Sequence, residues 1–546
     1  MTKQRLVPLM VFIASSLMLW ETWQSDHAPA QPAMSATAAP LAGQTSSLPQ
    51  PVSQDSGTVP PAPAAQTPES AELRHGTSVK VQTDLVEADI DTAGGDIRSL
   101  RLLKQLDADD KPVQLLEDKG ALIYVVQSGL LGTGLPNHTS PFVPDVPQAS
   151  LAPGQDNLDI SLRATIPGVA EVVKTYHFSR NSYLVTMDTT VRNLGSTPIS
   201  PEAYYQFLRS SQVPTGDPRF VSTYTGPAVY TNDTKFQKVA FKDIDKGKQD
   251  YPVTANNGWI AMLQHYFVAA WLPQQGMKRE FFTRKVGNDL YTAGVILPMQ
   301  AIAPGASVTQ AVPLYLGPQE GTKLKSLAPG LDLTIDYGRL TLIAVPLFSV
   351  LSWIHGWVGN WGVAIILLTV LIKAIFFPLS AASYKSMAKM RLLQPKLTKI
   401  KEQYGDDKAR YNQAMMELYK NEKVNPLGGC LPMIVQIPVF ISLYWVLLGA
   451  VELRHAPFFG WIHDLSAQDP YYILPVLMTA SMILQQRMSP KPADPVQAKV
   501  MMAMPLAFSV MFLFFPSGLV LYWVVNNLLS IAQQWQITRM IGDGKR

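Results

Sequence analysis

A lysine inside a long apolar stretch is the residue with the clearest chemical meaning in this sequence. Lys373 occurs in the segment WGVAIILLTVLIKAIFFPLS, and a cation within a membrane-spanning segment usually marks a functional site because burying an unpaired charge is costly. Thr369 precedes it by four residues and therefore lies on the same helix face. A structural alternative exists, because Lys373 lies only about 7.5 Å before Pro378 at 1.5 Å per residue, and a lysine stem can reach the interface over that distance.

Other apolar segments carry polar residues that extend this pattern. In the topology derived below, nearly all of them fall in the cytoplasmic half of the bilayer, whereas the other half is apolar with aromatic ends. We therefore predict a hydrated notch that opens to the cytoplasm, because a through-pore needs polar positions at both depths. Polar bonds between helices are the alternative. The residues are Trp523, Asn526, Asn527, Ser530 and Gln533 (or its neighbour Gln534) in the last segment, with Gln436, Gln485, Gln486 and Arg487 in two others.

The composition excludes several classes of protein. The 546 residues carry a net charge of only +4, which is too small for a broad nucleic-acid footprint. A single cysteine excludes a disulfide framework and a cysteine-rich zinc site. The eight histidines show no metal-binding spacing, and no phosphate-binding loop motif occurs. We expect no catalytic residue, no metal and no cofactor.

The first part of the chain divides by composition into three regions. Residues 1–23 place Lys3 and Arg5 before an apolar run and predict a signal-anchor transmembrane helix, with a cleaved signal peptide as the alternative. Residues 24–75 are rich in Pro, Ala and Ser and predict a disordered linker. Residues 76–337 predict a large antiparallel β-sandwich, because short runs rich in Val, Thr, Tyr and Phe alternate with turn residues. The runs are Val79 to Ile90, Ala121 to Gln127, Leu158 to Thr165, Val172 to Phe178, Tyr183 to Val191, Phe236 to Phe241, Trp259 to Leu272, Tyr291 to Pro298 and Val308 to Leu316.

The second part of the chain is dominated by apolar segments. Residues 338–358 are long enough to span a membrane, but Trp353, His355 and Trp357 favour an amphipathic helix in the interface. Residues 359–540 contain candidate spans at Trp361 to Leu379, Leu431 to Ala450, Tyr472 to Leu484, Met502 to Phe515 and Leu519 to Ile537. Several are shorter than the roughly 20 residues that a bilayer requires, so flanking residues must contribute or the membrane must be thin there.

Basic residues predict the orientation of these spans. The loop at 380–425 is rich in Lys and Arg, and residues 541–546 form a short basic tail. A protein of six transmembrane helices with both termini in the cytoplasm places every basic segment inside and the β domain outside. In a bacterial cell, that outside compartment is the periplasm.

The basic loop at 381–424 predicts a cytoplasmic helical hairpin. Met390, Leu393, Leu397, Ile400 and Tyr404 recur at steps of three and four, as in a helix–helix seam. Pro395 can kink the first helix, and Asp406 or Asp407 can cap the second. The hairpin is either an ordinary solvated element or a contact surface for ribosomal RNA or anionic lipid. The candidate contact residues are Lys385, Lys389, Arg391, Asp406, Asp407 and Lys408.

Four stretches, SMAKMRLLQPK, NPLGGCLPMIVQIPVFISLYWVL, PFFGWIHDLSAQDPYYILP and FPSGLVLYWVVNN, resemble the YidC membrane protein insertase family (YidC/Oxa/Alb). The resemblance covers residues 340–540, and the arrangement of anchor, linker and β domain is similar to the Gram-negative form. It implies an inner-membrane insertase and chaperone with five core helices around a hydrophilic groove that is open to cytoplasm and lipid. It also implies a periplasmic β-supersandwich similar to sugar-mutarotase folds.

The same resemblance implies a site and partners. Lys373 occupies the position of a positive charge that is usually Arg, so the charge is kept while the bidentate fork is lost. Trp523 occupies the position of an aromatic residue that contacts the incoming helix in this family. Thr369 occupies the position of a polar residue in the family's groove. The implied partners are nascent membrane proteins, the ribosome, the Sec translocon and membrane lipids, with no small-molecule substrate. A small-molecule or ion transporter and a membrane-tethered periplasmic sugar-binding or sugar-processing protein are the alternatives.

Overall fold

The computed structural model describes residues 73–107, 109–120, 122–214, 223–405, 407–422, 424, 431–488 and 495–543. The predicted signal anchor at 1–23 lies outside the described residues, as do residues 24–72 of the predicted linker and Asp406.

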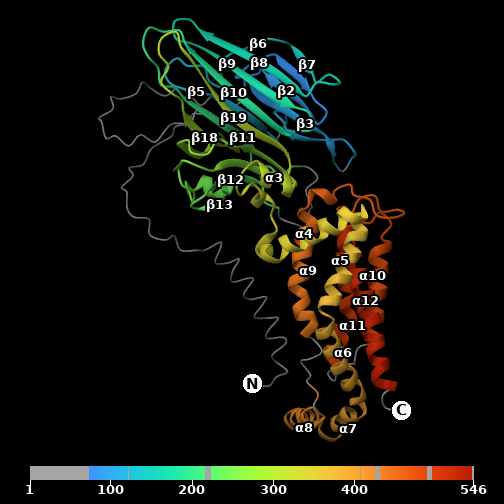
Figure 1. The fold of residues 1–546 in the computed structure, drawn as a ribbon. Helices are drawn as coiled ribbons and strands as arrows, with labels where there is room; N and C mark the ends of the chain where they lie inside the picture. The colour runs from blue at the N-terminus through green and yellow to red at the C-terminus, as the bar shows by residue number, and fades with distance from the viewer. Residues whose placement is uncertain are drawn as a thin grey trace. The chain divides into compact units, whose positions relative to one another are not determined.

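Two β-sheets form a sandwich between residues 78 and 318 (Figure 1). In spatial order, the first sheet contains β14 (Thr254–Ala255), β17 (Arg279–Lys285), β18 (Leu290–Pro298), β11 (Glu202–Ser210), β5 (Tyr124–Leu131), β3 (Asp96–Leu106), β2 (Val86–Asp91), β1 (Ser78–Gln82) and β7 (Gln148–Ser150), with β4 (Pro112–Leu116) paired to β3. The second contains β13 (Lys235–Lys238), β12 (Gly226–Thr231), β15 (Trp259–Gln264), β16 (Phe267–Trp271), β19 (Ser307–Pro318), β10 (Leu184–Asn193), β9 (Ala170–Ser179), β8 (Asn157–Ile166) and β6 (Val143–Pro144).

The prediction of a β-sandwich is confirmed, and its core explains why these residues form strands. Strand β9 alternates buried and half-buried residues along its whole length, because successive side chains point to opposite faces. It pairs antiparallel with β10, so that Val185 lies opposite Phe178. Between the sheets, the rings of Tyr205 and Trp271 lie 5.0 Å apart and are fully buried. Burying each such side chain stabilises the fold by roughly 1.5–3 kcal/mol. The described strand pairs are antiparallel except for β1 with β7.

Two of the predicted runs each contain two strands. The run from Val79 to Ile90 is the pair β1 and β2. The run from Trp259 to Leu272 is the hairpin β15–β16, which turns at His265 and Tyr266, where Tyr266 has a positive φ of 67°. This turn could not be predicted from the sequence, because the turn contains no Gly, Pro, Asn or Asp.

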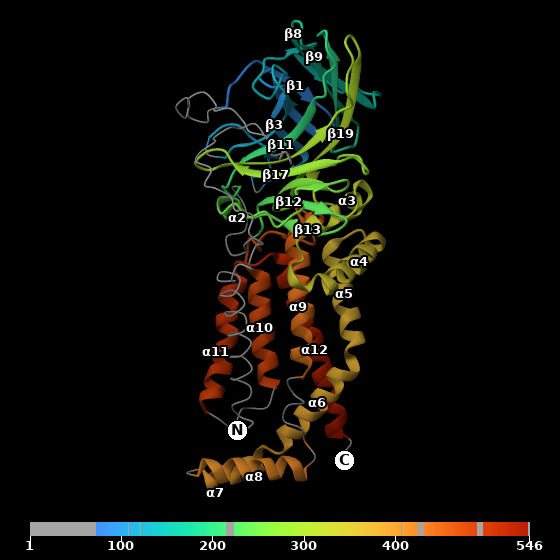
Figure 2. The same ribbon diagram turned by 90° about the vertical axis from the view of Figure 1, so that its left-hand side faces the viewer.

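Helices dominate after residue 320. The described helices are α2 (Phe241–Asp245), α3 (Gly321–Leu327), η2 (Leu331–Thr334), η3 (Gly338–Leu340), α4 (Thr341–Val358), α5 (Trp361–Ile375), α6 (Phe377–Leu392), α7 (Gln394–Tyr404), α8 (Lys408–Asn421), α9 (Leu431–Gly449), η5 (Val451–Leu453), α10 (Ile473–Met488), α11 (Pro495–Phe512) and α12 (Ser517–Asp543). Helices α5, α9, α10, α11 and α12 run side by side (Figure 1, Figure 2).

The lengths of these helices leave the six-span topology a prediction. Among the described helices, only α4 is by itself long and apolar enough to cross a membrane. Helices α5 and α6 meet the same test as a pair, but they are bent by 68°. The predicted span from Trp361 to Leu379 therefore breaks after Ile375. Pro378 lies in the first turn of α6, where its missing N–H leaves no helix hydrogen bond unmade.

Helix α4 crosses the end of the helix bundle (Figure 1, Figure 2). Ala344, Leu351 and Ile354 are buried on one face, whereas Trp353 and Trp357 on another are 63% and 78% exposed. Gly359 ends the helix with a left-handed φ of 67°, and its N–H donates to the carbonyl of His355 at 2.8 Å. This arrangement suits a helix lying in the membrane interface, which stays a prediction.

Candidate polar cluster in the helix bundle

Polar side chains from three helices meet at one level of the bundle. At 1.5 Å per residue, Lys373 lies about 18 Å along α5 from Trp361, Ser530 about 20 Å along α12 from Ser517, and Gln436 about 20 Å along α9 from Gly449. The loop at 456–471 contacts the starts of both α5 and α12, through the Asn360 amide and the Ser517 hydroxyl. Helices α5 and α12 therefore begin on one side of the bundle, where α9 ends, and the three residues lie at a similar depth.

Lys373 is the charged member of this cluster. Its Nζ donates to Ser530 Oγ at 2.7 Å, and the Ser530 hydroxyl donates to the carbonyl of Asn526 at 2.7 Å. The Lys373 side chain is only 7% exposed, and no described carboxylate pairs with it. Thr369 is also buried, but its hydroxyl donates to the carbonyl of Ile365 on its own helix. Lys373 is thus a buried cation held by one hydroxyl, with N–H groups left to donate.

Gln436 connects α9 to the same cluster. Its Nε2 donates to Asn526 Oδ1 at 3.1 Å and to the Tyr522 hydroxyl at 2.9 Å. Tyr522 is not among the groove residues predicted from the sequence. A signal for it exists, because Tyr522, Asn526 and Ser530 are spaced by four residues and so share one helix face.

Two other polar residues of α12 face α10 instead. Asn527 Nδ2 donates to Ser481 Oγ at 3.1 Å, and Gln534 Nε2 donates to the carbonyl of Met488 at 3.1 Å. The one polar stripe that was predicted along α12 is therefore divided between two faces. Asn527 acts here as a polar connection between helices. Gln533 is half-buried and makes no described hydrogen bond through its Oε1.

Trp523 lies between α9 and α11, one residue from Tyr522. Its ring makes edge contacts with Phe440 at 4.7 Å and Phe512 at 5.7 Å between centroids. Its buried Nε1 has no hydrogen-bond partner among the described residues. An indole with an unused N–H at the border of an apolar wall and a polar cluster suits contact with a chain that has both characters.

The predicted hairpin contains three helices rather than two. Helix α6 ends at Leu392, and α7 begins at Gln394 with Pro395 in its first turn. Asp407 caps α8 by accepting from the backbone N–H groups of Ala409 and Arg410. Lys385, Lys389 and Arg391 are exposed on α6, and Lys408 begins α8. Figure 2 shows α7 and α8 crosswise to the bundle.

A cavity of about 110 Å³ lies between α6, α10 and α12, which we call the α6–α10–α12 cavity. It lies beside the cluster, because Gln534 is one helical turn beyond Ser530. Its lining includes Tyr384, Met387, Arg391, Met488, Gln534 and Thr538.

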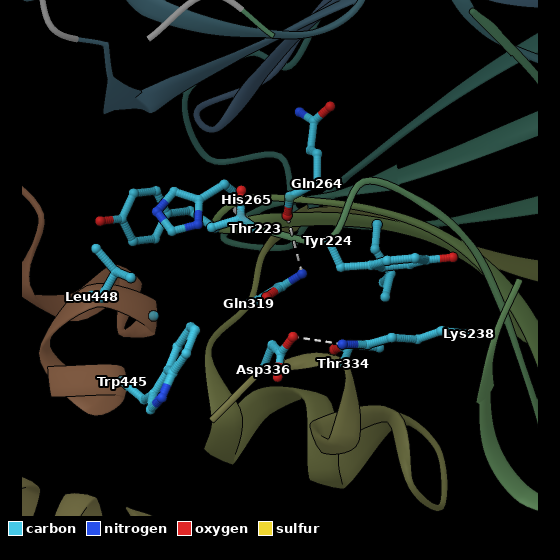
Figure 3. A pocket seen from close by; sticks show the side chains of 13 residues that line it. Thr223, Tyr224, Lys238, Gln264, His265, Gln319, Thr334, Asp336, Trp445 and Leu448 are labelled. Carbon is cyan, nitrogen blue, oxygen red and sulfur yellow. Dashed lines mark hydrogen bonds and ion pairs between the residues drawn. The ribbon is translucent and has the colours of Figure 1, made fainter. Parts of the chain in front are cut away.

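A second, smaller cavity of about 30 Å³ lies between the β domain and α9 (Figure 3). Trp445 and Leu448 form its α9 side. Across it, Lys238 pairs with Asp336 at 2.5 Å, and Gln319 donates to the carbonyl of Gln264. These groups satisfy one another, so the cavity suits a packed contact better than a ligand site. Among the described residues, no group of three or more His, Cys, Asp or Glu side chains forms a metal site.

Comparisons with known proteins place most of this sequence among membrane proteins. Residues 353–544 match the family described as 60Kd inner membrane protein, and residues 78–350 match the YidC periplasmic domain. Membrane protein insertase YidC of Nitrosospira multiformis is 52% identical, covering 99% of this chain and 98% of the relative. The insertase YidC of Aromatoleum aromaticum is 53% identical, covering 100% and 99%. A crystal structure of an active YidC insertase matches at 18% identity and a TM-score of 0.39, covering 84% and 95%.

Proposed function

Because this chain belongs to the YidC membrane protein insertase family, we propose that the cluster around Lys373 receives the leading segment of a newly made inner-membrane protein. The family is one of non-enzymatic insertases in the inner membrane, with a periplasmic domain. Its clients are nascent membrane proteins. The observation that carries the proposal is the Lys373 ammonium, which is buried in the bundle and has the Ser530 hydroxyl as its one partner among the described residues.

The charge of Lys373 attracts an acidic leading segment. At about 4 Å, two opposite charges attract by roughly 1 kcal/mol in water and 4 kcal/mol at the effective dielectric near a protein surface. Breaking the bond between Lys373 and Ser530 costs about 1 kcal/mol. The exchange of a hydroxyl for a carboxylate is therefore about neutral in water and favourable by about 3 kcal/mol at the effective dielectric near a protein surface. Opening the cluster to the cytoplasm converts it into the hydrated groove that the sequence predicts.

Polar side chains also lower the barrier for the client's own polar groups. Moving an unpaired polar group from water to hydrocarbon costs several kcal/mol. Gln436, Asn526 and Ser530 offer amides and hydroxyls inside the helix bundle that such groups can bind. The transmembrane potential adds about 2.3 kcal/mol per charge for each 100 mV. Burial of the client's apolar segment in lipid supplies the remaining driving force, so the mechanism needs no nucleotide.

The rest of the chain has supporting roles in this proposal. Both termini and the hairpin at 381–424 lie in the cytoplasm, where exposed Lys385, Lys389 and Arg391 contact the ribosome or anionic lipid. Helix α4 lies in the periplasmic interface with Trp353 and Trp357 in lipid. The insertase works alone or with the Sec translocon.

Photo-crosslinking tests the proposal directly. A photoreactive amino acid at Trp523 should cross-link to the client in stalled ribosome–nascent-chain complexes, because Trp523 borders the cluster. The same probe at Leu528, which is 54% exposed on another face of α12, is the matched control. Equal cross-linking at both positions, or none at Trp523, would contradict the proposal.

A further inference from the structure

The α6–α10–α12 cavity has a polar group without a hydrogen-bond partner among the residues that the structure describes. Gln534 is only 4% exposed, and its Oε1 has no hydrogen-bond partner among the described residues. The amide orientation follows from its neighbour: the Met488 carbonyl can only accept, so the atom that faces it at 3.1 Å must be Nε2. Oε1 is therefore a buried acceptor for which the described residues supply no N–H or O–H donor.

Resting on the function proposed above, we infer that this cavity binds the polypeptide backbone of the client's leading segment, with Gln534 Oε1 accepting a peptide N–H. The donor is backbone because an insertase receives many sequences, and the peptide N–H is common to nearly all of them. An extended segment has its N–H groups free, whereas a helix has already used them. The occupant is therefore the leading segment before it becomes helical.

The remaining lining suits an occupant whose side chains vary. Met387 and Met488 are flexible, polarizable side chains that adapt to different shapes. Arg391 is the charged residue of the lining, and it matches an acidic leading segment. The volume of about 110 Å³ is several times the roughly 10–15 Å³ that one water molecule needs on the same measure. It can therefore hold more than a single bridging water.

The cavity lies next to the cluster around Lys373, because Gln534 is one helical turn from Ser530. Tyr384 lines the cavity and also interacts with the Ser530 side chain. Ser530 in turn holds the Lys373 ammonium. A chain that enters past Gln534 thus meets Tyr384 and Ser530 before Lys373. This order makes the cavity the first binding step and the cluster the second.

The test removes a single N–H from the client and leaves this protein unchanged. A client translated in vitro carries an α-hydroxy acid at one position of its leading segment, which replaces one peptide N–H by an ester oxygen. A photoreactive amino acid at Met387 reports occupancy of the cavity in ribosome–nascent-chain complexes of the full-length protein, and the exposed Lys389 of the same helix is the control position. We expect one leading-segment position to cross-link to Met387 and its ester to reduce that yield about fivefold, as for the loss of one hydrogen bond.

Variants on α12 separate the possible outcomes. Gln534→Met should lower the cross-link yield and abolish the difference between amide and ester, whereas Gln536→Met, at an exposed position of α12, should retain both. Ester clients that cross-link as well as amide clients at every position overturn the backbone contact. Cross-links from Met387 only to lipid overturn the inference while the cross-link at Trp523 preserves the proposed function. Loss of client cross-links at both positions overturns both.

Discussion

Lys373 is buried deeply enough that its charge must serve a purpose beyond solubility. A lysine that only extended to the membrane surface would show an exposed head group, yet its side chain is 7% exposed and its ammonium binds Ser530. Removing a charge from water is expensive unless it is paired. The described residues offer a hydroxyl rather than a carboxylate. In the function proposed above, an acidic segment of the client supplies the counter-ion.

Substitutions at Lys373 test this electrostatic argument. Lys373→Arg keeps the positive charge and should insert acidic-tailed clients normally. Lys373→Glu reverses an attraction of about 1–4 kcal/mol and should reduce their insertion at least about tenfold. Protease protection of the translocated tail measures both. A client with a neutral leading segment is the control, and its insertion should differ less between the two variants. Normal insertion of acidic-tailed clients by Lys373→Glu would refute this role.

Asp469 has a structural role that can be measured separately. Its carboxylate is 2% exposed and accepts from the Trp461 indole N–H and the backbone N–H groups of Tyr471 and Leu474. These contacts connect the loop before α10 to the first turn of that helix. Asp469→Ala leaves three donors without this acceptor, of which the Leu474 N–H is buried, and should lower the free energy of unfolding by about 2–4 kcal/mol and the thermal midpoint by several degrees.

The conservative variant provides the control for Asp469. Asp469→Asn keeps one acceptor oxygen, so its thermal midpoint should lie between those of Asp469→Ala and the wild type. Thermal unfolding in detergent measures all three. An Asp469→Ala protein that unfolds together with the wild type would show that these hydrogen bonds contribute little.

The sequence predicts residue types in the cluster better than it predicts their partners. Lys373 and Thr369 stand out because a polar residue in an apolar run is conspicuous. Adjacent pairs such as Asn526 and Asn527 differ by 100° around a helix, and periodicity alone cannot say which faces which neighbour. The structure separates them, because Asn526 binds Gln436 and Asn527 binds Ser481. Helix rotation depends on packing, which a single sequence does not contain.

At the scale of elements, two prolines mark where one predicted segment divides into separate helices. Pro378 and Pro395 both lie in the first turn of a helix, so the segment that reads as a span and a hairpin arm becomes α5, α6 and α7. Turns without Gly or Pro were harder to predict, as the hairpin at His265 and Tyr266 shows. Strand β11 has buried residues on both faces, so it lacks the alternation that identifies a strand. Sheet order depends on long-range pairing and cannot be read from local patterns.

The η5 turn after α9 carries a carboxyl that makes stability depend on pH. Burial raises the pKa of Glu452 to about 7, with Glu320 contributing through like charge. The folded state then holds this proton more tightly than the unfolded state. Protonated Glu452 therefore stabilises the folded state fully below about pH 4.5, and this stabilisation is lost as the pH rises through 7.

Glu452→Gln should remove this part of the pH dependence. The free energy of unfolding of the wild type should fall by up to about 3 kcal/mol between pH 4.5 and 8, at 1.36 kcal/mol per pKa unit. That of the variant should fall by less. Burial also raises the pKa of Asp96, to about 6, so only the difference between the two proteins reports Glu452. Thermal midpoints across this pH range measure it. Parallel profiles for the two proteins would contradict the assignment.

At the scale of the whole molecule, the β domain and the helix bundle have separable roles. The insertase family favours a function in the bundle over solute transport or periplasmic sugar chemistry. Deleting residues 76–320 should therefore leave much of the insertion activity, because the cluster uses only α5, α9 and α12. Growth of a cell depleted of its own insertase measures the retained function. Complete loss of growth, with the truncated protein present in the membrane, would argue that the β domain takes part in insertion.

The central claim is that the cluster opens to the cytoplasm and not to the periplasm. Single cysteines at Thr369 and Ser530, in a chain whose one natural cysteine is replaced by Cys430→Ser, report this with a membrane-impermeant thiol reagent. Leu367→Cys, on the exposed face of α5, is the control that lipid should shield. We predict that the two cluster cysteines react only with reagent on the cytoplasmic side. Cysteines that never react, or that react from the periplasmic side, would contradict the account.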